Sequence, residues 1–441
     1  VRGLRSLRTG FDKDAAIALC LLPGIGIPVL VGGDHFGGFR FYQPIWPLLC
    51  LLAVMHWSVV FGRLQPLKTR IGLIMLLLCG WILFPLTARM KHEFRIAREG
   101  RETGAALEIM FADLDEYPTV ATITAGGSKR GLCGRACEAG ELDVSGHRGV
   151  VNYEPGELVL SARAGTPLTE IEALLQGENQ VLAFEPPTYA GTATLGGTLA
   201  SNLSGPARPW SGSVRDMVLG VQLINGTGEL LNFGGRVMKN VAGYDVSRLQ
   251  AGALGTLGVL TEITLKVLPA QERSLTLCYE MGALDALDLM HRRAAQAAPL
   301  NGACWLDNTL RLRLCGTAAA VAATASEWGG DLEEDGDSFW LRLRNHELPY
   351  FRGESPLWRL SLDSNSRILS DEPDLLIDWG GAQRWLRGER EPGPLQQLAA
   401  GAGGHATLFA GGDRQGEVRQ PLPLGEQRLQ QALKRSFDPA G

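Results

Sequence analysis

The sequence predicts an α+β globular protein that is preceded by an apolar, helical N-terminal region. Three observations support this fold class. Apolar side chains make up 45% of the 441 residues and charged side chains 20%, a composition that excludes wholesale disorder. Several long stretches near the N-terminus contain no charged side chain. After Pro118, short Val, Ile and Leu runs alternate with glycine-rich connections and helix-like segments, which indicates mixed strands and helices.

The uncharged stretches span residues 15–33, 41–62 and 71–88. Each is close to the ~20 residues with which an α-helix crosses a bilayer. The second and third are rich in Leu and Ile, whereas the first contains PGIGIP and fits a broken or re-entrant helix. A buried helical hairpin of a soluble protein is the alternative. We predict that residues 1–92 form a membrane region with two or three helices.

The number of spans decides the orientation. With two spans, the positive-inside rule places the large C-terminal part in the cytoplasm, whereas three spans slightly favour the reverse. We prefer two spans. The segment GGDHFGGFRFYQPIWPLL, residues 32–49, faintly resembles a loop of bacterial polytopic membrane proteins of the glycosyltransferase type. A fusion, a misjoined reading frame and a bare anchor all remain open for this region.

Beyond the N-terminal region, the elements follow from local pattern. Residues 93–117 are rich in charged side chains, which predicts a linker or a first helix. Thr166 can cap the helix expected over 166–176. Arg311 and Arg313 alternate along an expected strand and are predicted to face solvent. The strands are expected in 119–127, 157–165, 217–226, 258–268, 310–314 and 339–345, and further helices in 285–297 and 318–328.

Glycine is concentrated where a phosphate-binding site would need it. Residues 121–265 contain 24 glycines in 145 positions, and glycine allows positive φ and a close approach of the backbone to a ligand. The first cluster, TAGGSKRG, adds Lys129 and Arg130, although a plain hairpin turn is the alternative there. Neither a P-loop nor a GxGxxG fingerprint occurs, so a Rossmann site is not supported. The clusters are Thr124–Gly131, Glu185–Gly205, Trp210–Gly220 and Lys239–Ile263.

The order and spacing of these clusters resemble the FAD-binding fold of the vanillyl-alcohol oxidase/PCMH superfamily. Within it, the chain resembles the FAD-binding E subunit of bacterial glycolate oxidase, from about residue 118 to the C-terminus. The strings that carry the resemblance are HRGVVNYEPGELVLSARAGTPLTEIEALL (147–175), RPWSGSVRDMVLG (208–220), FGGRVMKNVAGYDVSRL (233–249), CWLDNTLRLRL (304–314), PLWRLSL (356–362), LIDWGGAQRWL (376–386) and GGHATLFAGGD (403–413).

The resemblance implies a domain organisation. A PCMH-type, two-subdomain FAD-binding fold would occupy residues 118–270, and an α+β cap domain would occupy residues 271–390. Residues 391–441 would return to the FAD-binding domain. The family continues with an NPGR segment that helps to close the flavin site, whereas this sequence ends in FDPAG, so we expect this last segment to be truncated.

The resemblance also implies which residues approach FAD. The first loop would hold the pyrophosphate, the second cluster would line the diphosphate and ribityl chain, and the others would lie near the adenosine half or shape the flavin pocket. These residues are Gly126, Gly127, Ser128, Lys129, Gly191, Thr192, Thr194, Leu195, Gly196, Gly197, Asn202, Ser213, Arg215, Asp216, Lys239, Asn240, Gly243, Tyr244, Asp245, Gly258 and Val259.

Covalent attachment of flavin in this superfamily usually needs a His in the first glycine loop or a suitably placed Cys. The loop GGSKRG has no His. Cys133 and Cys137 follow it with a CxxxC spacing that matches no metal pattern alone, and we expect them to be structural thiols. The sequence therefore predicts non-covalent FAD.

The chemistry is less well marked than the cofactor. Oxidation of a 2-hydroxy acid requires a base, a cation for the carboxylate, and a flavin that accepts hydride. Related D-2-hydroxy-acid dehydrogenases carry a metal motif, HxGDGNxH, that is missing here, and no metal site is predicted. Lone His147 and His291 are expected to be structural. Candidates for a substrate or subunit pocket are Arg359, Asp378, Arg384 and His405, with a fold-supporting role as the alternative for each.

The resemblance implies that the chain is the FAD-binding subunit of a glycolate-oxidase-like complex that oxidises glycolate or D-lactate. The alternative is a non-catalytic assembly or electron-transfer subunit. Its partners would be a sister flavin subunit and an iron–sulfur subunit, since this sequence has no iron–sulfur cysteine run. We expect the bacterial inner membrane as location, with the flavin domain in the cytoplasm. The net charge of −5 gives no drive toward nucleic acid.

Overall fold

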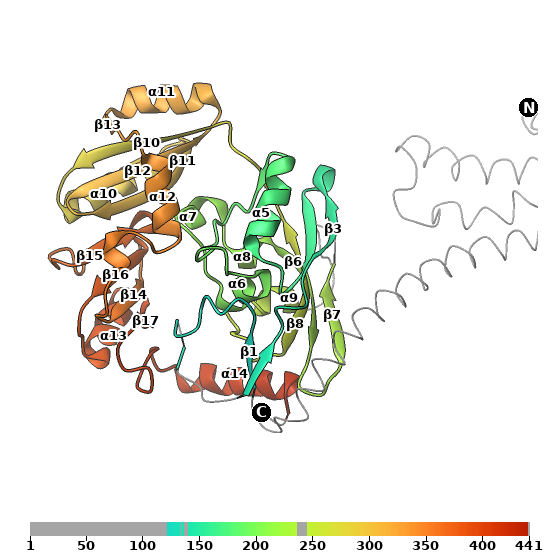
Figure 1. Ribbon diagram of the computed structural model, residues 1–441. Coiled ribbons are helices and arrows are strands. Elements are labelled where there is room, and N and C mark those ends of the chain that lie inside the picture. The colour runs from blue at the N-terminus through green and yellow to red at the C-terminus, as the bar shows by residue number, and fades with distance from the viewer. Residues whose placement is uncertain (1–120, 133, 136–139, 236–244, 440–441) are drawn as a thin grey trace, which may run out of the picture. The chain divides into compact units, whose positions relative to one another are not determined.

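The computed structural model describes residues 121–132, 134–135, 140–235 and 245–439 (Figure 1). The chain divides into two compact units, residues 1–107 and 108–441, and all described residues belong to the second. The predicted membrane region and the linker lie outside the described residues. Within the described ranges, no helix is both long and apolar enough to cross a bilayer.

The first half of the described chain is built on a five-stranded antiparallel sheet, in the order β3-β4-β8-β6-β7. A parallel pair, β1-β2, precedes it in sequence, and a short pair, β5-β9, accompanies it. The strands are β1 (Ala121–Thr124), β2 (Gly140–Asp143), β3 (Val150–Glu154), β4 (Val159–Arg163), β5 (Gln180–Val181), β6 (Val218–Ile224), β7 (Leu230–Gly234), β8 (Val259–Lys266) and β9 (Leu268–Pro269).

Helices cover this sheet and close one hydrophobic core with it. Helix α5 buries Leu168, Ile171 and Leu175, spaced at three and four residues, against Leu160 of β4 and its neighbours. The helices of this half are α5 (Leu168–Gly177), α6 (Leu195–Ser201), α7 (Arg208–Ser211), α8 (Val214–Met217) and α9 (Val246–Leu249), with a 3-10 turn η1 (Pro155–Glu157).

The predicted cap of α5 is wrong. Pro167, not Thr166, occupies the N-cap position, and it makes no side-chain cap. The Thr166 hydroxyl instead accepts a hydrogen bond from the Gly149 amide at 2.9 Å and lies 3.2 Å from the Gly149 carbonyl. Because Thr166 lies one residue too early, it ties the loop before β3 rather than the first helical turn.

The second half is an eight-stranded sheet in the order β13-β10-β12-β11-β15-β16-β14-β17. Its neighbouring strands pair antiparallel. The strands are β10 (Arg273–Glu280), β11 (Leu300–Leu306), β12 (Thr309–Gly316), β13 (Asp331–Leu332), β14 (Leu357–Ser361), β15 (Leu375–Asp378), β16 (Gln383–Arg387) and β17 (His405–Ala410).

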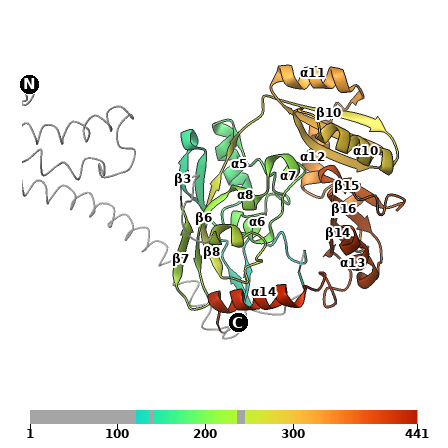
Figure 2. The same cartoon turned by 180° about the vertical axis from the view of Figure 1, so that it is seen from behind.

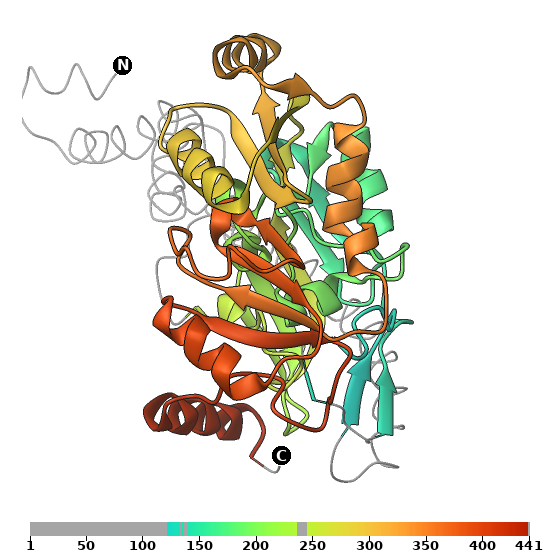
Figure 3. The same ribbon diagram turned by 90° about the vertical axis from the view of Figure 1, so that its left-hand side faces the viewer.

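The two faces of this sheet have different neighbours. On the outer face, α10 (Ala283–Ala294), α11 (Ala318–Trp328) and α13 (Pro392–Gly401) pack on the alternate side chains of the strands, and Figure 3 shows α10 in yellow and α13 in red on this side. On the inner face, α12 (Gly336–Arg344) joins a smaller apolar cluster. The 3-10 turns η2 (Pro349–Phe351) and η3 (Trp379–Gly381) lie between strands of this half.

The strand predicted over residues 339–345 is wrong, because this segment is part of α12. The run FWLRLRN alternates apolar and charged residues and so matches a strand in a short window. In the folded chain the buried members are Gly336, Trp340 and Leu343, which follow the four- and three-residue spacing of a helix. The Trp340 indole donates to the Thr276 hydroxyl at 2.9 Å, which fixes the helix on β10.

The boundary predicted at residue 390 also needs correction. Strand β17 pairs with β14, and α13 packs on β17, so residues 392–410 belong to the eight-stranded sheet. Helix α14 (Leu424–Phe437) contacts the other core: Phe437 is buried in it, and its carbonyl accepts from the Gly226 amide at 2.8 Å. Both views of Figures 1 and 2 place α14 at the lower end of β1.

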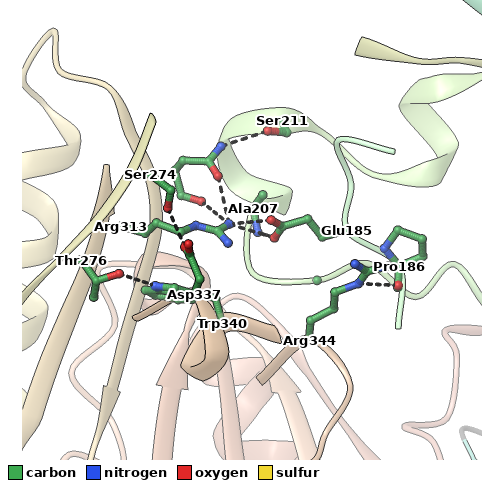
Figure 4. A network of polar contacts seen from close by, with 12 residues as sticks. Glu185, Pro186, Ala207, Ser211, Ser274, Thr276, Arg313, Asp337, Trp340 and Arg344 are labelled. Carbon is green, nitrogen blue, oxygen red and sulfur yellow. Dashed lines mark hydrogen bonds and ion pairs between the residues drawn. The ribbon is translucent and has the colours of Figure 1, made fainter. Parts of the chain in front are cut away.

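The two halves meet at a buried guanidinium, and this corrects the prediction that Arg313 faces solvent. Arg313 on β12 is only 7% exposed. Its Nη2 lies 2.9 Å from the Glu185 carboxylate and also donates to the carbonyl and side-chain oxygens of Asn301 (Figure 4). Glu185 in turn accepts from the Ala207 amide at 2.9 Å. A charge is tolerated at such burial only when it is paired and hydrogen-bonded.

We expect Arg313→Met to lower the free energy of unfolding by about 3 to 5 kcal/mol, because it leaves the Glu185 carboxylate at the junction without its counter-ion. Urea unfolding followed by circular dichroism measures this. The control is Arg367→Met, which removes an exposed ion pair with Asp288 and should cost less than about 1 kcal/mol. The double change Glu185→Gln with Arg313→Met should recover part of the loss; equal losses in the two arginine variants would contradict the assignment.

Candidate functional site

A cavity of about 470 Å³ lies against the first glycine cluster. This volume is in the range of small-molecule and cofactor sites. Most of the wall comes from β1 with the loop that follows it, residues 134–135, α6 and its N-cap, and the turn around residues 254–260. Val144, Ala164 and Arg414 complete it. Segments almost three hundred residues apart in sequence therefore meet at one site.

The loop after β1 is shaped by its glycines. Gly127 and Gly131 have φ values of +66° and +77°, which other residues adopt only at a cost. A Cβ on Gly126 would lie 1.6 Å from the Thr192 carbonyl oxygen, so the loop backbone packs directly against the chain before α6. The Arg130 amide donates to the Gly127 carbonyl at 3.1 Å, which closes a turn over Ser128 and Lys129. At Gly126 and Gly127 the loop presents only backbone to the cavity, and Ser128, Lys129 and Arg130 also line it.

The charged residues that line the cavity are all cations: Lys129, Arg130, Arg135 and Arg414, with no Asp or Glu among the described lining residues. Arg414 donates to the Leu408 carbonyl at 2.8 Å and to the Gly134 carbonyl, and so closes one wall. Backbone amides in a glycine loop together with several cations form a site suited to a diphosphate. The residues present therefore fit the phosphate part of a dinucleotide.

Eight of the residues predicted to approach FAD line this cavity: Gly126, Gly127, Ser128, Lys129, Thr194, Gly196, Gly197 and Gly258. Nine others are described but lie outside its lining: Gly191, Thr192, Leu195, Asn202, Ser213, Arg215, Asp216, Asp245 and Val259. Lys239, Asn240, Gly243 and Tyr244 lie outside the described residues. For all of them, contact with FAD stays a prediction.

Several of the nine have a local role. Ser213 and Asp216 form a capping box at α8, and the carboxylate accepts from the Ser213 amide and hydroxyl at 2.8 Å each. These hydrogen bonds lower the pKa of Asp216. Leu195 is buried in the core, and Asp245 caps α9 by accepting from the Arg248 amide. Arg414 was not among the predicted residues: it directly follows the string GGHATLFAGGD but lies outside the four glycine clusters.

Three of the four predicted pocket residues share the inner face of the eight-stranded sheet. Strand alternation and register place Arg359, His405 and Asp378 on the side of Trp385 and Phe409, which belong to the inner cluster. Arg384 alternates with Trp385 and lies on the opposite face. It donates to the Ser366 and Ile368 carbonyls, and burial lowers its pKa to about 10. Arg384 therefore supports the fold and is not near the other three.

Asp378 is buried, with 3% exposed. Its Oδ1 accepts from the Trp379 amide at 2.7 Å, and its Oδ2 lies 3.4 Å from the Gln383 side-chain nitrogen. Removal from water raises its pKa to about 7.

His405 stands at the exposed start of β17, and partial burial and the charge of Arg359 lower its pKa. His147 is buried, whereas His291 on α10 lies 2.9 Å from the Ser364 carbonyl.

The comparisons with known proteins define the class. Residues 112–234 match the family model described as "FAD binding domain". An alkyldihydroxyacetonephosphate synthase structure superposes with a TM-score of 0.52 at 15% identity, over 74% of this chain and 71% of that one, and shows the fold alone. Fold, cavity and domain match together define a flavoprotein with a PCMH-type FAD-binding domain. The cofactor predicted from the sequence, FAD, is confirmed by this match.

The relatives identify the family within this class. Glycolate oxidase subunit GlcE of Escherichia coli (strain K12) is 47% identical over 316 residues, which are 72% of this chain and 89% of that protein. The chain belongs to the GlcE family. Glycolate oxidase subunit GlcD of Bacillus subtilis (strain 168) is 32% identical over 36% of this chain and 34% of its own length. A D-lactate dehydrogenase of Anaerostipes hadrus is 31% identical over 35% and 33%.

We expect Gly126→Ala to abolish or strongly reduce bound FAD, because the added methyl group would overlap the Thr192 carbonyl and displace the loop from the cavity. The ratio of flavin absorbance to protein absorbance in the purified chain measures this. The control is Gly146→Ala, where the methyl group meets nothing within 4 Å. A Gly126→Ala protein with normal flavin content would show that the loop does not hold the cofactor.

Asp378 generates a pH-dependent contribution to stability. Its native pKa of about 7 lies above the unfolded value of about 4, so the native state binds more protons between these pH values and its stability falls as the pH rises through them. In Asp378→Asn this loss is absent. Relative to the wild type, the variant should gain stability from pH 4 to pH 7, by at most about 1.4 kcal/mol per pH unit, and no more above pH 7. Urea unfolding over pH 4 to 8 measures the difference, with the exposed Asp374→Asn as control; parallel profiles would contradict the raised pKa.

Proposed function

We propose that this chain is the FAD-binding subunit of a glycolate-oxidase-like complex that oxidises a short 2-hydroxy acid, glycolate or D-lactate. The observation that carries the proposal is the cationic, glycine-lined cavity in a member of the GlcE family. The relatives named glycolate oxidase subunit GlcD and D-lactate dehydrogenase support the same substrate class.

In this proposal the residues divide into two groups by location. The loop from Gly126 to Lys129 holds the FAD diphosphate through its backbone, and Lys129, Arg130, Arg135 and Arg414 balance the phosphate charge. FAD, when bound, supplies the acceptor for the hydride of the substrate C–H bond. The inner face of the eight-stranded sheet, which carries Arg359 and His405, faces the FAD-binding half and forms the substrate side.

A non-catalytic assembly or electron-transfer subunit is the second candidate. Two observations favour it: the sequence has no HxGDGNxH motif, and the Asp378 carboxylate is buried and already hydrogen-bonded, so it is a poor base for a substrate hydroxyl. In either case the subunit works with a sister flavin subunit and an iron–sulfur subunit that carries electrons away.

We further propose that the complex is attached to the bacterial inner membrane through two spans, residues 41–62 and 71–88, with the flavin domain on the cytoplasmic side. The support is the length and uncharged character of these stretches. Fractionation of cells that express the full chain and a chain lacking residues 1–92 tests this. Equal recovery of both in the soluble fraction would contradict it.

The function is tested by the visible spectrum of the full chain, purified in detergent alone and with co-purifying subunits. Acid precipitation should release the flavin into the supernatant, since we expect non-covalent FAD. Anaerobic glycolate should then bleach the flavin bands near 450 nm of the complex, whereas ethylene glycol, which lacks the carboxylate, should not. Bleaching of the complex but not of the isolated chain favours the second candidate. Colour that stays in the pellet would overturn non-covalent binding, and no bleaching of either sample would overturn the substrate class.

A further inference from the structure

Helix α12 ends with a histidine at a position that favours glycine. The His346 amide donates to the Leu343 carbonyl at 3.2 Å. The Glu347 amide donates to the Arg342 carbonyl at 2.8 Å, and the two hydrogen bonds together form a Schellman motif. Glycine usually occupies the left-handed position of this motif, because it has no Cβ. Here that position is His346, with a φ of +56°, so the geometry of the helix end does not explain the histidine.

The His346 side chain contacts the FAD-binding half of the molecule. The Tyr189 hydroxyl lies 3.0 Å from His346 Nδ1, within hydrogen-bond distance. Tyr189 belongs to the chain before α6 and also has a positive φ, +46°. The residues that precede these two are joined as well, since the Asn345 side-chain oxygen accepts from the Thr188 amide at 2.8 Å and from its hydroxyl at 3.1 Å. Two consecutive residues of each half are therefore connected.

Aromatic rings of the inner cluster fix the imidazole of His346. The ring centres of Phe351, Trp385 and Phe409 lie 5.0, 5.2 and 5.2 Å from its own. Burial among these rings lowers the pKa of His346 to about 3, so the imidazole is neutral at physiological pH. A neutral imidazole has one nitrogen that donates and one that accepts, and a hydroxyl can pair with either. The Tyr189 hydroxyl therefore meets an uncharged partner in a fixed position.

The ring of Tyr189 contacts a cation of the cofactor cavity. The Lys129 ammonium lies 5.5 Å from the ring centre of Tyr189, which is the distance of a cation–π interaction. Lys129 belongs to the first glycine loop and lines the cavity. Its ammonium donates to the Ser128 hydroxyl at 3.3 Å, and a Cβ on Gly197 would lie 3.7 Å from it. The ammonium therefore lies between the glycine loop and the first turn of α6, which both line the cavity.

A lysine that binds phosphate gains affinity when contacts at its end orient it in advance. Its side chain has many rotamers, and ordering them on binding costs free energy. Contacts that order the side chain before the ligand arrives remove part of this cost. Strained backbone persists where the surroundings over-determine it, and it is concentrated at functional sites. Here the two strained residues, Tyr189 and His346, are the ones whose side chains connect the eight-stranded half to Lys129.

We propose that Tyr189 and His346 are positioning residues for the cofactor, which hold the Lys129 ammonium at the cavity where the FAD diphosphate binds. Neither of the two is among the described residues that line this cavity, so both act through Lys129. The eight-stranded half thereby contributes to the affinity for FAD through a contact that lies outside the cavity. This inference rests on the proposed function for the contact between Lys129 and the diphosphate.

The test is a double-mutant cycle on the Kd for FAD of the full chain, purified in detergent, freed of flavin and titrated with FAD. Lys129→Met should raise this Kd about 10- to 100-fold, as expected for the loss of a contact to a charged group. Tyr189→Leu, which removes the ring under the ammonium, should raise it about 3- to 10-fold. In the Lys129→Met chain, Tyr189→Leu should change the Kd by less than about twofold, because Tyr189 acts through Lys129.

The salt dependence of FAD binding is a second readout. Salt screens the attraction between the ammonium and the diphosphate, so added salt should weaken FAD binding less in Lys129→Met and Tyr189→Leu than in the wild type. Tyr189→Phe keeps the ring in place and removes only the hydroxyl that contacts His346. Its Kd for FAD should lie between those of the wild type and Tyr189→Leu, and it keeps the test decisive if Tyr189→Leu does not fold.

The matched control is Tyr350→Phe, the same change in the same inner cluster. The Tyr350 hydroxyl donates to the Trp385 carbonyl at 2.7 Å, so its removal should lower the unfolding midpoint. The Kd for FAD and its salt dependence should stay at the wild-type values in this variant. An unchanged Kd in Lys129→Met or in both Tyr189 variants overturns the inference, and so does an effect of Tyr189→Leu that is equally large with and without Lys129.

The inference and the proposed function fail separately. Coupling between Tyr189 and Lys129, without reduction of wild-type flavin by glycolate, keeps the positioning role and overturns the substrate class. Reduction by glycolate with an unchanged Kd for FAD in the Tyr189 variants keeps the function and overturns the positioning role. No binding of FAD to the wild-type chain overturns both.

Discussion

The ion pair between Arg313 and Glu185 is the interaction on which the arrangement of the two halves depends. It is the more deeply buried of two ion pairs across their junction, the other being Arg344 with Glu172, and it brings the loop that starts at Glu185 onto the eight-stranded sheet. That loop therefore makes contacts with both halves of the molecule. Its Thr188 amide donates to Asn345 of the sheet half, whereas Gly196 and Gly197 form one wall of the cofactor cavity.

The backbone of this segment, which contacts both halves, adopts strained conformations. Glu185, Tyr189, Ala190 and Asn202 all have positive φ, although none of them is glycine. Such conformations persist only where surrounding contacts over-determine them. The Glu185 carboxylate, the Tyr189 hydroxyl and the Ala207 amide each have a hydrogen-bond partner that supplies such contacts. The strained residues Glu185, Tyr189 and Ala190 lie directly before Thr194, Gly196 and Gly197, which line the cavity, so this segment links the junction to the cavity wall.

The net charge of the chain and the charge of the residues around the cavity have opposite signs. The chain carries a net charge of −5, yet the charged groups that line the cavity are cations. A local positive potential in a partly dehydrated site concentrates anions far more effectively than net charge repels them.

Elements whose signals are local could be predicted from the amino-acid sequence. The strands β4, β6 and β8 and the helix α11 lie within predicted segments, and β12, α5 and α10 overlap theirs, since period-two and period-3.6 patterns with glycine boundaries act over a few residues. The first glycine loop could also be predicted, because the consecutive glycines Gly126 and Gly127 indicate a stretch of backbone without side chains. Family membership was also readable, since its motifs are ordered strings.

Which side chains contact each other depends on packing and strand register in the folded chain, and could not be predicted from the sequence. The alternation in FWLRLRN fits strand and helix equally well, and packing of Trp340 on β10 selected the helix. Arg311 and Arg313 look alike in sequence, but only the second finds Glu185 across the junction. Arg384 and Arg359 were equal candidates in the sequence, but strand register places them on opposite faces of the sheet. These outcomes depend on register and on contacts between residues far apart in the chain, which no local pattern encodes.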